Sequence, residues 1–269
     1  MNNPLSFSSV KLDLFSRDGG RLKPASGFVI EVDNQYYLIT NWHVVSGAQK
    51  ELDMKPYLLK TSVHIHGGAG EKAAPLWMGI RKKITVQLYD DNDSPKWIEH
   101  QTHDERQHIV DIVALPIQVD LTLLLFSGKL PGIVMEKGSW AENTDYWTKV
   151  SAIPISAIDT DVEYGPPDTV HIIGYPFGWQ PDGTDRTSSA FWRTGFIASE
   201  IYEPGMRRAN TFFVDPSPPE GMTGSPVVGM KNDRIKLLGV YSDWSTAEFG
   251  ANAGLVCGAW LVKQLIRAS

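Results

Sequence analysis

Residues 221–228 read G-M-T-G-S-P-V-V, with the hydroxyl of Thr223 between two glycines. Glycines at these places let the backbone turn sharply and point several N–H groups at one spot. Two other strings stand earlier in the chain: L-I-T-N-W-H-V-V contains His43, and V-D-I-V-A-L contains Asp111. The chain therefore carries a histidine, an aspartate and a hydroxyl in that order, each beside a strand-like run.

These three residue types suit one kind of chemistry. Peptide hydrolysis by an alcohol needs a base, a group that fixes the tautomer of that base, and donors for the developing oxyanion. His43 follows a strand-like run and opens a V-V-S-G turn, which favours a position at a strand end facing a cleft. Asp111 precedes an apolar run, where a carboxylate is costly unless it is hydrogen-bonded, and an imidazole N–H is a suitable partner. One such string alone is more simply explained as a turn or as a solvated acid. Three strings, in the order histidine, aspartate and hydroxyl, favour a set of catalytic residues.

Four further strings surround the set. They are A-S-G-F-V-I at 25–30, I-I-G-Y-P-F-G at 172–178, T-G-F-I-A-S-E at 194–200 and L-L-G-V-Y-S at 237–242. With these strings, the chain resembles the trypsin-like proteases of the chymotrypsin fold, and among them the bacterial high-temperature-requirement type. The resemblance runs from about residue 8 to the end.

The resemblance implies an all-β fold of two six-stranded antiparallel barrels, with a C-terminal helix. Residues 1–120 would form the N-terminal barrel with His43 and Asp111, residues 121–145 an inter-barrel linker, and residues 146–269 the C-terminal barrel with Thr223 and the helix. A PDZ-like segment after Ser269 is not expected. The expected activity is that of an endopeptidase with a polypeptide substrate.

The resemblance also implies the parts of the site. The N–H groups of Gly221 and Thr223 would form the oxyanion hole, and Ser217, Tyr241 and Ser242 would contact substrate. Ser217 would lie at the base of the primary specificity pocket. Since a serine there carries no charge, the pocket is expected to prefer small or apolar side chains over Lys and Arg, unless Asp215 reaches it.

Thr223 stands where the family has serine. Threonine keeps the hydroxyl, but its β-branch restricts χ1 and puts a methyl near the oxyanion hole or the substrate carbonyl. Three readings stay open: an active enzyme with threonine, a pseudoprotease that binds peptide, or a threonine introduced in place of serine. Ser225 is a poor substitute nucleophile. It lies two residues after Thr223, beside Pro226, at a position where the family has a structural glycine or serine.

Composition narrows the class of protein. The 269 residues are 42% apolar and include 24 glycines and 17 prolines, which favours a turn-rich β protein with a full core. The net charge is −6 and no basic stripe is present, which argues against nucleic-acid binding. Cys257 is the only cysteine, so no intrachain disulfide is expected. No apolar run approaches the ~18 residues of a membrane helix.

The remaining expectations concern location and ligands. The start, M-N-N-P-L-S, lacks the pattern of a signal peptide, so the cytoplasm is the expected compartment and a monomer is plausible. No cofactor is expected. A histidine-based metal site is the weaker alternative to a polar loop; its candidates are His64, His66, His100, His103 and His108. Trp179, Trp192 and Trp244 are more simply packing residues than parts of a substrate cleft.

Strand-like runs recur along the whole chain. A hairpin is expected where D-N-Q separates 27–32 from 36–40, and the pattern at 259–266 predicts a helix. Because the strands do not alternate with long helices, a parallel α/β fold is disfavoured. The other expected strands lie at 9–15, 84–89, 109–117, 170–174, 195–199, 211–214, 225–228, 235–241 and 254–257.

Overall fold

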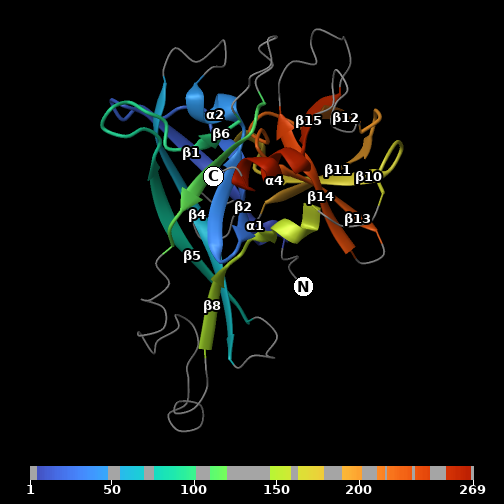
Figure 1. Ribbon diagram of the computed structural model, residues 1–269, viewed down its shortest axis with the longest axis horizontal. Helices are drawn as coiled ribbons and strands as arrows, with labels where there is room; N and C mark the ends of the chain where they lie inside the picture. The colour runs from blue at the N-terminus through green and yellow to red at the C-terminus, as the bar shows by residue number, and fades with distance from the viewer. Residues whose placement is uncertain are drawn as a thin grey trace.

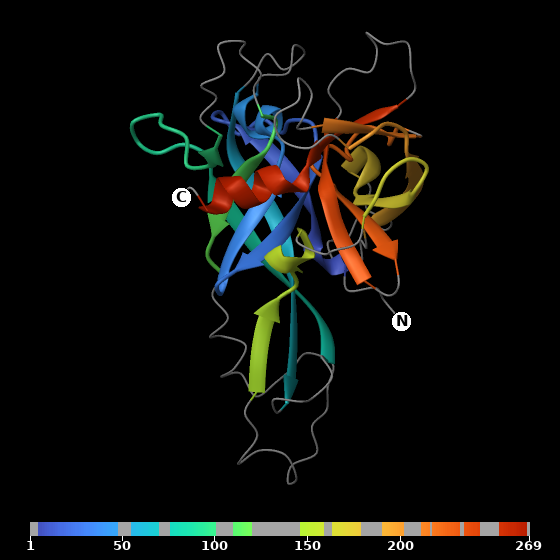
Figure 2. The same ribbon diagram turned by 45° about the vertical axis from the view of Figure 1, so that its right-hand side comes forward.

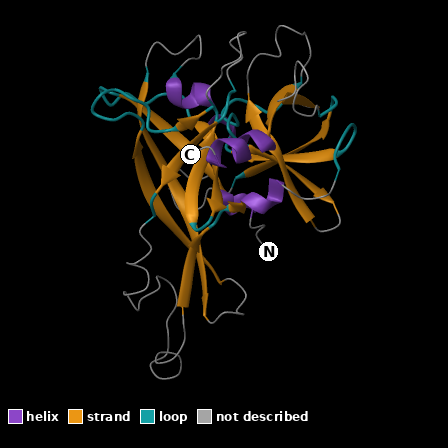
Figure 3. Ribbon diagram, in the orientation of Figure 1, coloured by secondary structure: helices purple, strands orange, loops and turns teal. Residues whose placement is uncertain are grey.

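The structure is a computed structural model in which two β units lie side by side (Figure 1). Strands make up most of both units, and the helices are few and short among the residues described (Figure 3). The structure describes residues 5–47, 55–69, 76–100, 110–119, 146–158, 163–178, 190–201, 211–215, 217–231, 234–242 and 253–267. The predicted linker at 121–145 lies outside them, as do Trp179, Trp244, His103 and His108.

The first unit is built on a curled sheet whose strand order is β5-β4-β1-β2-β3-β7-β6, with β8 pairing to β4 and β9 to β2. Its strands are β1 (Ser9–Ser16), β2 (Ala25–Val32), β3 (Gln35–Thr40), β4 (Pro56–Ala69), β5 (Leu76–Gln87), β6 (Ile98–Glu99), β7 (Val113–Ile117), β8 (Tyr146–Val150) and β9 (Ile153–Pro154). Three short helices accompany them: α1 (Leu5–Ser8), α2 (Trp42–Ser46) and the 3₁₀ turn η1 (Ile155–Ile158).

The hairpin between β2 and β3 is present as predicted. Asp33 and Asn34 both have positive φ, at 47° and 63°, and Val32 pairs with Gln35. Positive φ at both central residues matches the right-handed twist of the flanking strands, and Asp and Asn tolerate it better than most side chains. This tight turn sets the register of β3 against β2, which places Ile39 near the end of β3 opposite Phe28.

The second unit is a closed barrel of six antiparallel strands in the order β10-β11-β12-β15-β14-β13. Its elements are β10 (Thr169–Gly174), η2 (Pro176–Gly178), β11 (Phe191–Ile197), β12 (Thr211–Asp215), β13 (Pro226–Lys231), β14 (Arg234–Ser242) and β15 (Gly254–Gly258). The chain then continues into helix α4 (Ala259–Arg267). The predicted all-β fold with a C-terminal helix is confirmed.

The first unit differs in detail from a simple six-stranded barrel. Among the described residues its sheet has nine strands, because β8 and β9 return to pair with β4 and β2. By their pairing, these two strands belong to the first sheet, whereas the predicted division places residues from 146 onward in the second barrel. The ends of β4, β5 and β8 extend away from the rest of the molecule (Figure 2).

Helix α4 lies across the two units. It contacts β6 and β7 of the first sheet and β14 and β15 of the second barrel. Leu261, Val262 and Leu265 are buried on its inner face, and the ring of His100 hydrogen-bonds to the carbonyl of Leu261 over 2.9 Å. The shared core that results fixes the position of one unit against the other. No helix in the described residues is long and apolar enough to cross a membrane.

Candidate active site

His43 is placed by the end of β3. Asn41 keeps an extended backbone, with φ −81° and ψ 149°, and the short helix α2 begins at the next residue. Gly47 ends the helix in the left-handed region, at φ 75°. Its N–H donates to the carbonyl of His43. The single turn therefore holds His43 at the mouth of a strand, as the sequence predicts.

Asp111 comes to His43 through strand pairing. Strand β7 pairs antiparallel with β3, with Val113 opposite Thr40, so Asp111 lies beside the start of α2. The side-chain amide of Asn41 donates to the backbone carbonyl of Asp111 over 2.7 Å. The backbone N–H of His43 donates to Oδ1 of Asp111 over 3.0 Å. The first contact holds the backbone of Asp111, and the second holds its carboxylate.

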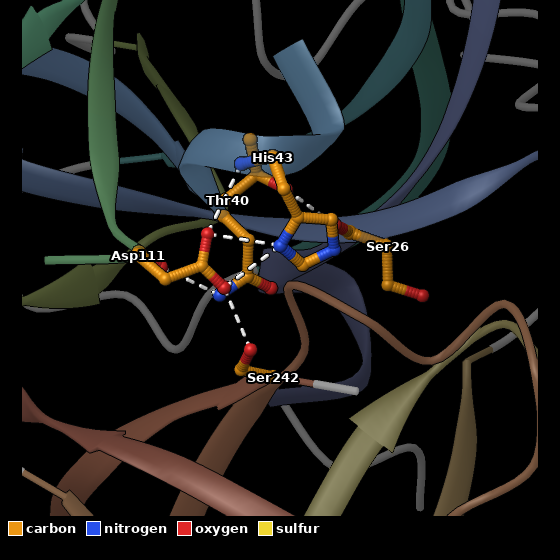
Figure 4. Close-up of polar contacts among 6 residues, drawn as sticks. Ser26, Thr40, His43, Asp111 and Ser242 are labelled. Atoms are coloured by element: carbon orange, nitrogen blue, oxygen red, sulfur yellow. Dashed lines mark hydrogen bonds and ion pairs between the residues drawn. The ribbon is translucent and has the colours of Figure 1, made fainter. Parts of the chain in front are cut away.

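The imidazole of His43 faces this carboxylate (Figure 4). Its Nδ1 lies 2.9 Å from Oδ1 and 2.8 Å from Oδ2 of Asp111. Both residues are buried, with 2% and 5% of their surface exposed. Because an ionised carboxylate only accepts hydrogen bonds, Nδ1 carries the proton. In the neutral ring Nε2 then has the lone pair that a general base requires.

The second barrel adds a hydroxyl to this pair. Ser242, the last residue of β14, donates from Oγ to Oδ2 of Asp111 over 2.6 Å (Figure 4). Cys257 of β15 lies close by, and burial followed by the charge of Asp111 raises the pKa of its thiol well above the usual range. The carboxylate is thus held by groups from both units.

The loop of Thr223 is shaped by glycines with positive φ. Gly221 has φ +90° and Gly224 has φ +89°. A Cβ on Gly221 would lie 2.7 Å from the N of Phe177 and 2.8 Å from the O of Tyr175, and one on Gly224 would meet the carbonyl of Ser26. Glycine is therefore required on both sides of Thr223, for backbone conformation and for space.

Ser26 joins this loop to the first sheet. Its N–H donates to the carbonyl of Thr223 over 2.8 Å, and its hydroxyl donates to the carbonyl of Gly221, also over 2.8 Å. That hydroxyl accepts from the N–H of Tyr175, while Thr40 donates to the Ser26 carbonyl over 2.9 Å. The sequence analysis did not single out Ser26, although the string A-S-G-F-V-I that contains it was part of the resemblance.

These bonds bring the Thr223 loop to the strand that leads into His43. Ser26 contacts both Thr223 and Thr40, and Thr40 precedes His43 by three residues. Thr223 is buried, with 7% of its surface exposed. No hydrogen bond joins its hydroxyl to Nε2 of His43 in the described part of the chain. Catalytic hydrogen bonds of this type are often long before substrate binds.

Comparison with known proteins identifies the family of the chain. The family model described as "Trypsin-like peptidase domain" matches residues 25–240. The chain belongs to the trypsin-like peptidase family. This is the family that the sequence analysis expected from the resemblance, and peptidases of this family act on polypeptides. No curated protein matches the chain.

Two solved structures resemble this chain. One is the HtrA-type protease AlgW, in a serine-to-alanine variant with tripeptide, at TM-score 0.53 and 12% identity, covering 98% of this chain and 60% of that chain. This likeness shows the fold, and the chain spans 60% of the length of the AlgW chain. The other is the inactive form of Rv3671c from M. tuberculosis H37Rv, a serine-to-alanine mutant, at TM-score 0.47 and 16% identity, covering 99% of this chain and 90% of that chain.

The residues predicted to contact substrate lie on and beside β14. Tyr241 has 1% of its surface exposed, and its backbone N–H donates to the carbonyl of Ser225. Its hydroxyl lies 3.2 Å from Oγ of Ser217 and 3.4 Å from the carbonyl of Pro218. Ser242 contacts Asp111 as described above.

Three of the histidines considered for a metal, His64, His66 and His100, have other contacts in the structure, and His103 and His108 lie outside the described residues. His64 is buried in β4 against the ring of Phe7, and His66 contacts the hydroxyl of Ser151. His100 contacts α4. Within the described ranges no group of three or more His, Cys, Asp or Glu residues is arranged to hold a metal ion. The Trp192 indole donates to Oγ of Ser6 over 2.7 Å, which is a packing role.

Proposed function

We propose that this peptidase is an endopeptidase that cleaves peptide bonds by acyl transfer, with His43 as the base, Asp111 as its orienting group and Thr223 as the nucleophile. The observation that carries the proposal is the buried contact of His43 Nδ1 with the Asp111 carboxylate at 2.8 Å. A buried carboxylate aligned with an imidazole fixes the tautomer and stabilises the imidazolium that forms during the reaction.

In the proposed first step, Oγ1 of Thr223 attacks the carbonyl carbon of the scissile peptide while its proton passes to Nε2 of His43. The N–H groups of Gly221 and Thr223 donate to the oxyanion. His43 then returns the proton to the leaving amine, and the acyl group remains as an ester on Thr223. Water, deprotonated by His43, hydrolyses the ester and restores the hydroxyl.

The methyl of Thr223 is expected to slow this reaction. A β-branched side chain has few χ1 rotamers, and the loop around Thr223 is fixed by Gly221, Gly224 and Ser26. Directing Oγ1 at His43 leaves little freedom for the methyl. A displacement of the nucleophile near 1 Å costs on the order of 100-fold in rate.

A peptide-binding pseudoprotease is the second candidate function. The observation that favours it is the threonine at position 223, whose methyl hinders attack in a loop held by Gly221, Gly224 and Ser26. A protease that a partner activates is a variant of the first proposal and has the same residues. The cytoplasm and a monomeric state remain expectations.

Labelling with a fluorophosphonate probe separates the two functions. We expect Thr223→Ser to label faster than the native chain, and Thr223→Val to show no labelling, because valine keeps the branch and loses the hydroxyl. His43→Ala in the Thr223→Ser background controls for activation by the base and should abolish labelling. Labelling of Thr223→Val at the native rate would exclude Thr223 as the nucleophile. No labelling of Thr223→Ser would favour the binding module.

A further inference from the structure

The loop that carries Thr223 has its carbonyls paired and two of its N–H groups unpaired. The carbonyls of residues 220–223 each accept a hydrogen bond. By contrast, no acceptor among the described residues takes the N–H of Gly221 or of Thr223, although both residues are buried. Backbone N–H groups of buried residues are almost always paired, so two unpaired ones in one loop indicate a place for a ligand oxygen. They are the two N–H groups that the proposed function assigns to the oxyanion.

The direction of each N–H follows from the carbonyl of the same peptide. In a trans peptide the C=O and the N–H point in opposite directions. The carbonyl of Glu220 accepts from the N–H of Phe177 over 2.7 Å, so the N–H of the same peptide points away from Phe177. The carbonyl of Met222 accepts from the N–H of Ser225 over 3.0 Å, which directs the N–H of Thr223 the opposite way. The carbonyl contacts of the loop therefore decide where its free N–H groups point.

Ser26 holds two further peptides of the same loop. Its hydroxyl donates to the carbonyl of Gly221 over 2.8 Å, and its N–H donates to the carbonyl of Thr223 over 2.8 Å. The hydroxyl oxygen also accepts from the N–H of Tyr175 over 2.9 Å. Ser26 is 0% exposed and lies in β2 of the first sheet, whereas the loop leads into β13 of the second barrel. One buried residue of one unit thus fixes two peptides of the other.

Gly221 needs such a contact because glycine restrains its own backbone little. Its φ of +90° is readily accessible to glycine, but many other conformations are accessible as well. Without the hydroxyl of Ser26, the carbonyl of Gly221 would be buried without this partner, which is costly. A rotation of the backbone at Gly221 would relieve that cost, and it would also turn the N–H of Gly221 away from the oxyanion.

We propose that Ser26 is a positioning residue of the oxyanion hole: its hydroxyl, from the first sheet, holds the Gly221 peptide of the second barrel in the orientation that the transition state needs. The inference rests on the proposed function. Donors that already point at a developing charge cost no reorganisation during the reaction. Their orientation therefore affects turnover more than it affects the binding of substrate.

The test compares Ser26→Ala with its parent, both in the Thr223→Ser background. We expect Ser26→Ala to lower kcat on a peptide substrate by about 10-fold or more, since loss of one oxyanion donor costs on the order of 100-fold. KM should stay within about 3-fold, because the lost interaction belongs to the transition state.

A peptidyl trifluoromethyl ketone gives a second readout in the same background. The hydroxyl oxygen at position 223 bonds to the ketone carbon, its proton passes to His43, and the former carbonyl oxygen becomes the anion. This adduct resembles the tetrahedral intermediate, so its affinity should fall with kcat in Ser26→Ala. A role of Ser26 in stability alone would not change the affinity of the folded protein for the ketone.

Ser9→Ala is the matched control. Ser9 is also 0% exposed, and its hydroxyl donates to the carbonyl of Ile173 in the second barrel over 2.9 Å. It makes the same kind of contact between the units, but away from the Thr223 loop. Its kcat should stay within about 3-fold of the parent. If Ser26→Ala does not fold, Ser26→Cys replaces it, since a thiol occupies the place of the hydroxyl but donates only weakly.

The outcomes separate this inference from the proposed function. Equal kcat in Ser26→Ala and its parent, an equal loss in Ser9→Ala, or a loss of kcat without a loss of ketone affinity would overturn the role of Ser26 and leave the proposed function standing. Absence of both turnover and fluorophosphonate labelling in the Thr223→Ser parent would overturn the proposed function, and this inference with it.

Discussion

The hydroxyl of Ser242 donates to the carboxylate of Asp111 over 2.6 Å, and the two residues come from different β units. Asp111 precedes β7 of the first sheet, while Ser242 ends β14 of the second barrel. One buried charge therefore depends on both units for its hydrogen bonds. The orientation of the His43 ring, which rests on this carboxylate, is in turn linked to the way the units pack.

Ser242→Ala should lower the free energy of unfolding by about 1–3 kcal/mol, because a buried carboxylate loses a charge-assisted hydrogen bond. It should also reduce peptidase turnover in the Thr223→Ser background. Ser8→Ala is the control, since that serine is also buried but donates to the neutral carbonyl of Leu5. Urea unfolding of both variants measures the difference. A smaller loss for Ser242→Ala than for Ser8→Ala would contradict the assignment.

Gly224→Ala should be among the most damaging single changes near the site. Its φ of +89° is unfavourable for alanine, and its Cβ would collide with the carbonyl of Ser26 and the hydroxyl of Thr40. We expect a loss of about 3 kcal/mol or more, or failure to fold, since backbone strain and overpacking add.

Two other glycines separate these two causes. Gly19 has φ +88° but nothing within 4 Å of its Cβ position, so Gly19→Ala should cost only the backbone strain of about 1–2 kcal/mol. Gly165 has neither a positive φ nor a close neighbour, so Gly165→Ala should be nearly neutral. Thermal unfolding of the three variants ranks them. Equal losses at Gly19 and Gly224 would show that the collision with Ser26 and Thr40 is relieved.

The sequence predicts the second barrel better than the first sheet. Short apolar runs separated by turns mark β10 to β15, and the hairpin at Asp33 and Asn34 follows from its turn chemistry. The sequence analysis misses strand β4, although the alternation of apolar side chains with polar ones such as Lys60, Ser62 and His64 is itself a strand pattern. The pairing of β8 with β4 joins positions far apart in the chain, and periodicity carries no information on such pairs.

At the site, the sequence predicts the contact of His43 with Asp111 but misses what supports it. The motif spacing identifies the two side chains, and the structure places them within hydrogen-bond distance. Ser26 and the contact of Ser242 with Asp111 depend on how the units pack, which no local string reveals. The role of Thr223 as nucleophile stays a prediction.

Acid should destabilise the fold in part through His64. Burial lowers its pKa from 6.5 to about 3, so the folded protein keeps the ring neutral where the unfolded chain binds a proton. The stability from this group is present above pH 6.5 and is lost as the pH falls from 6.5 toward 3, at up to about 1.4 kcal/mol per pH unit. His64→Asn should flatten the dependence of unfolding free energy on pH in this window. An unchanged slope would exclude His64 as the cause.

Tyr241 is predicted to set the depth of the primary specificity pocket, on the proposal that Ser217 lies at its base. The Tyr241 ring is buried, its hydroxyl lies 3.2 Å from Oγ of Ser217, and a Cβ on Gly254 would lie 2.6 Å from the ring. In the Thr223→Ser background, a peptide library should show cleavage after small or apolar residues, because a buried ammonium beside Ser217 has no ion pair.

Tyr241→Val should move this preference toward larger apolar residues, since it opens space behind Ser217. It should also cost about 2–4 kcal/mol of stability, because a cavity is left in the core. Tyr241→Phe is the matched control: it keeps the ring and removes only the hydroxyl contacts with Ser217 and Pro218, so the preference should stay as in the parent. Dominant cleavage after Lys or Arg in the parent would mean that an acid such as Asp215 reaches the pocket. An unchanged profile in a folded Tyr241→Val protein would place the pocket elsewhere.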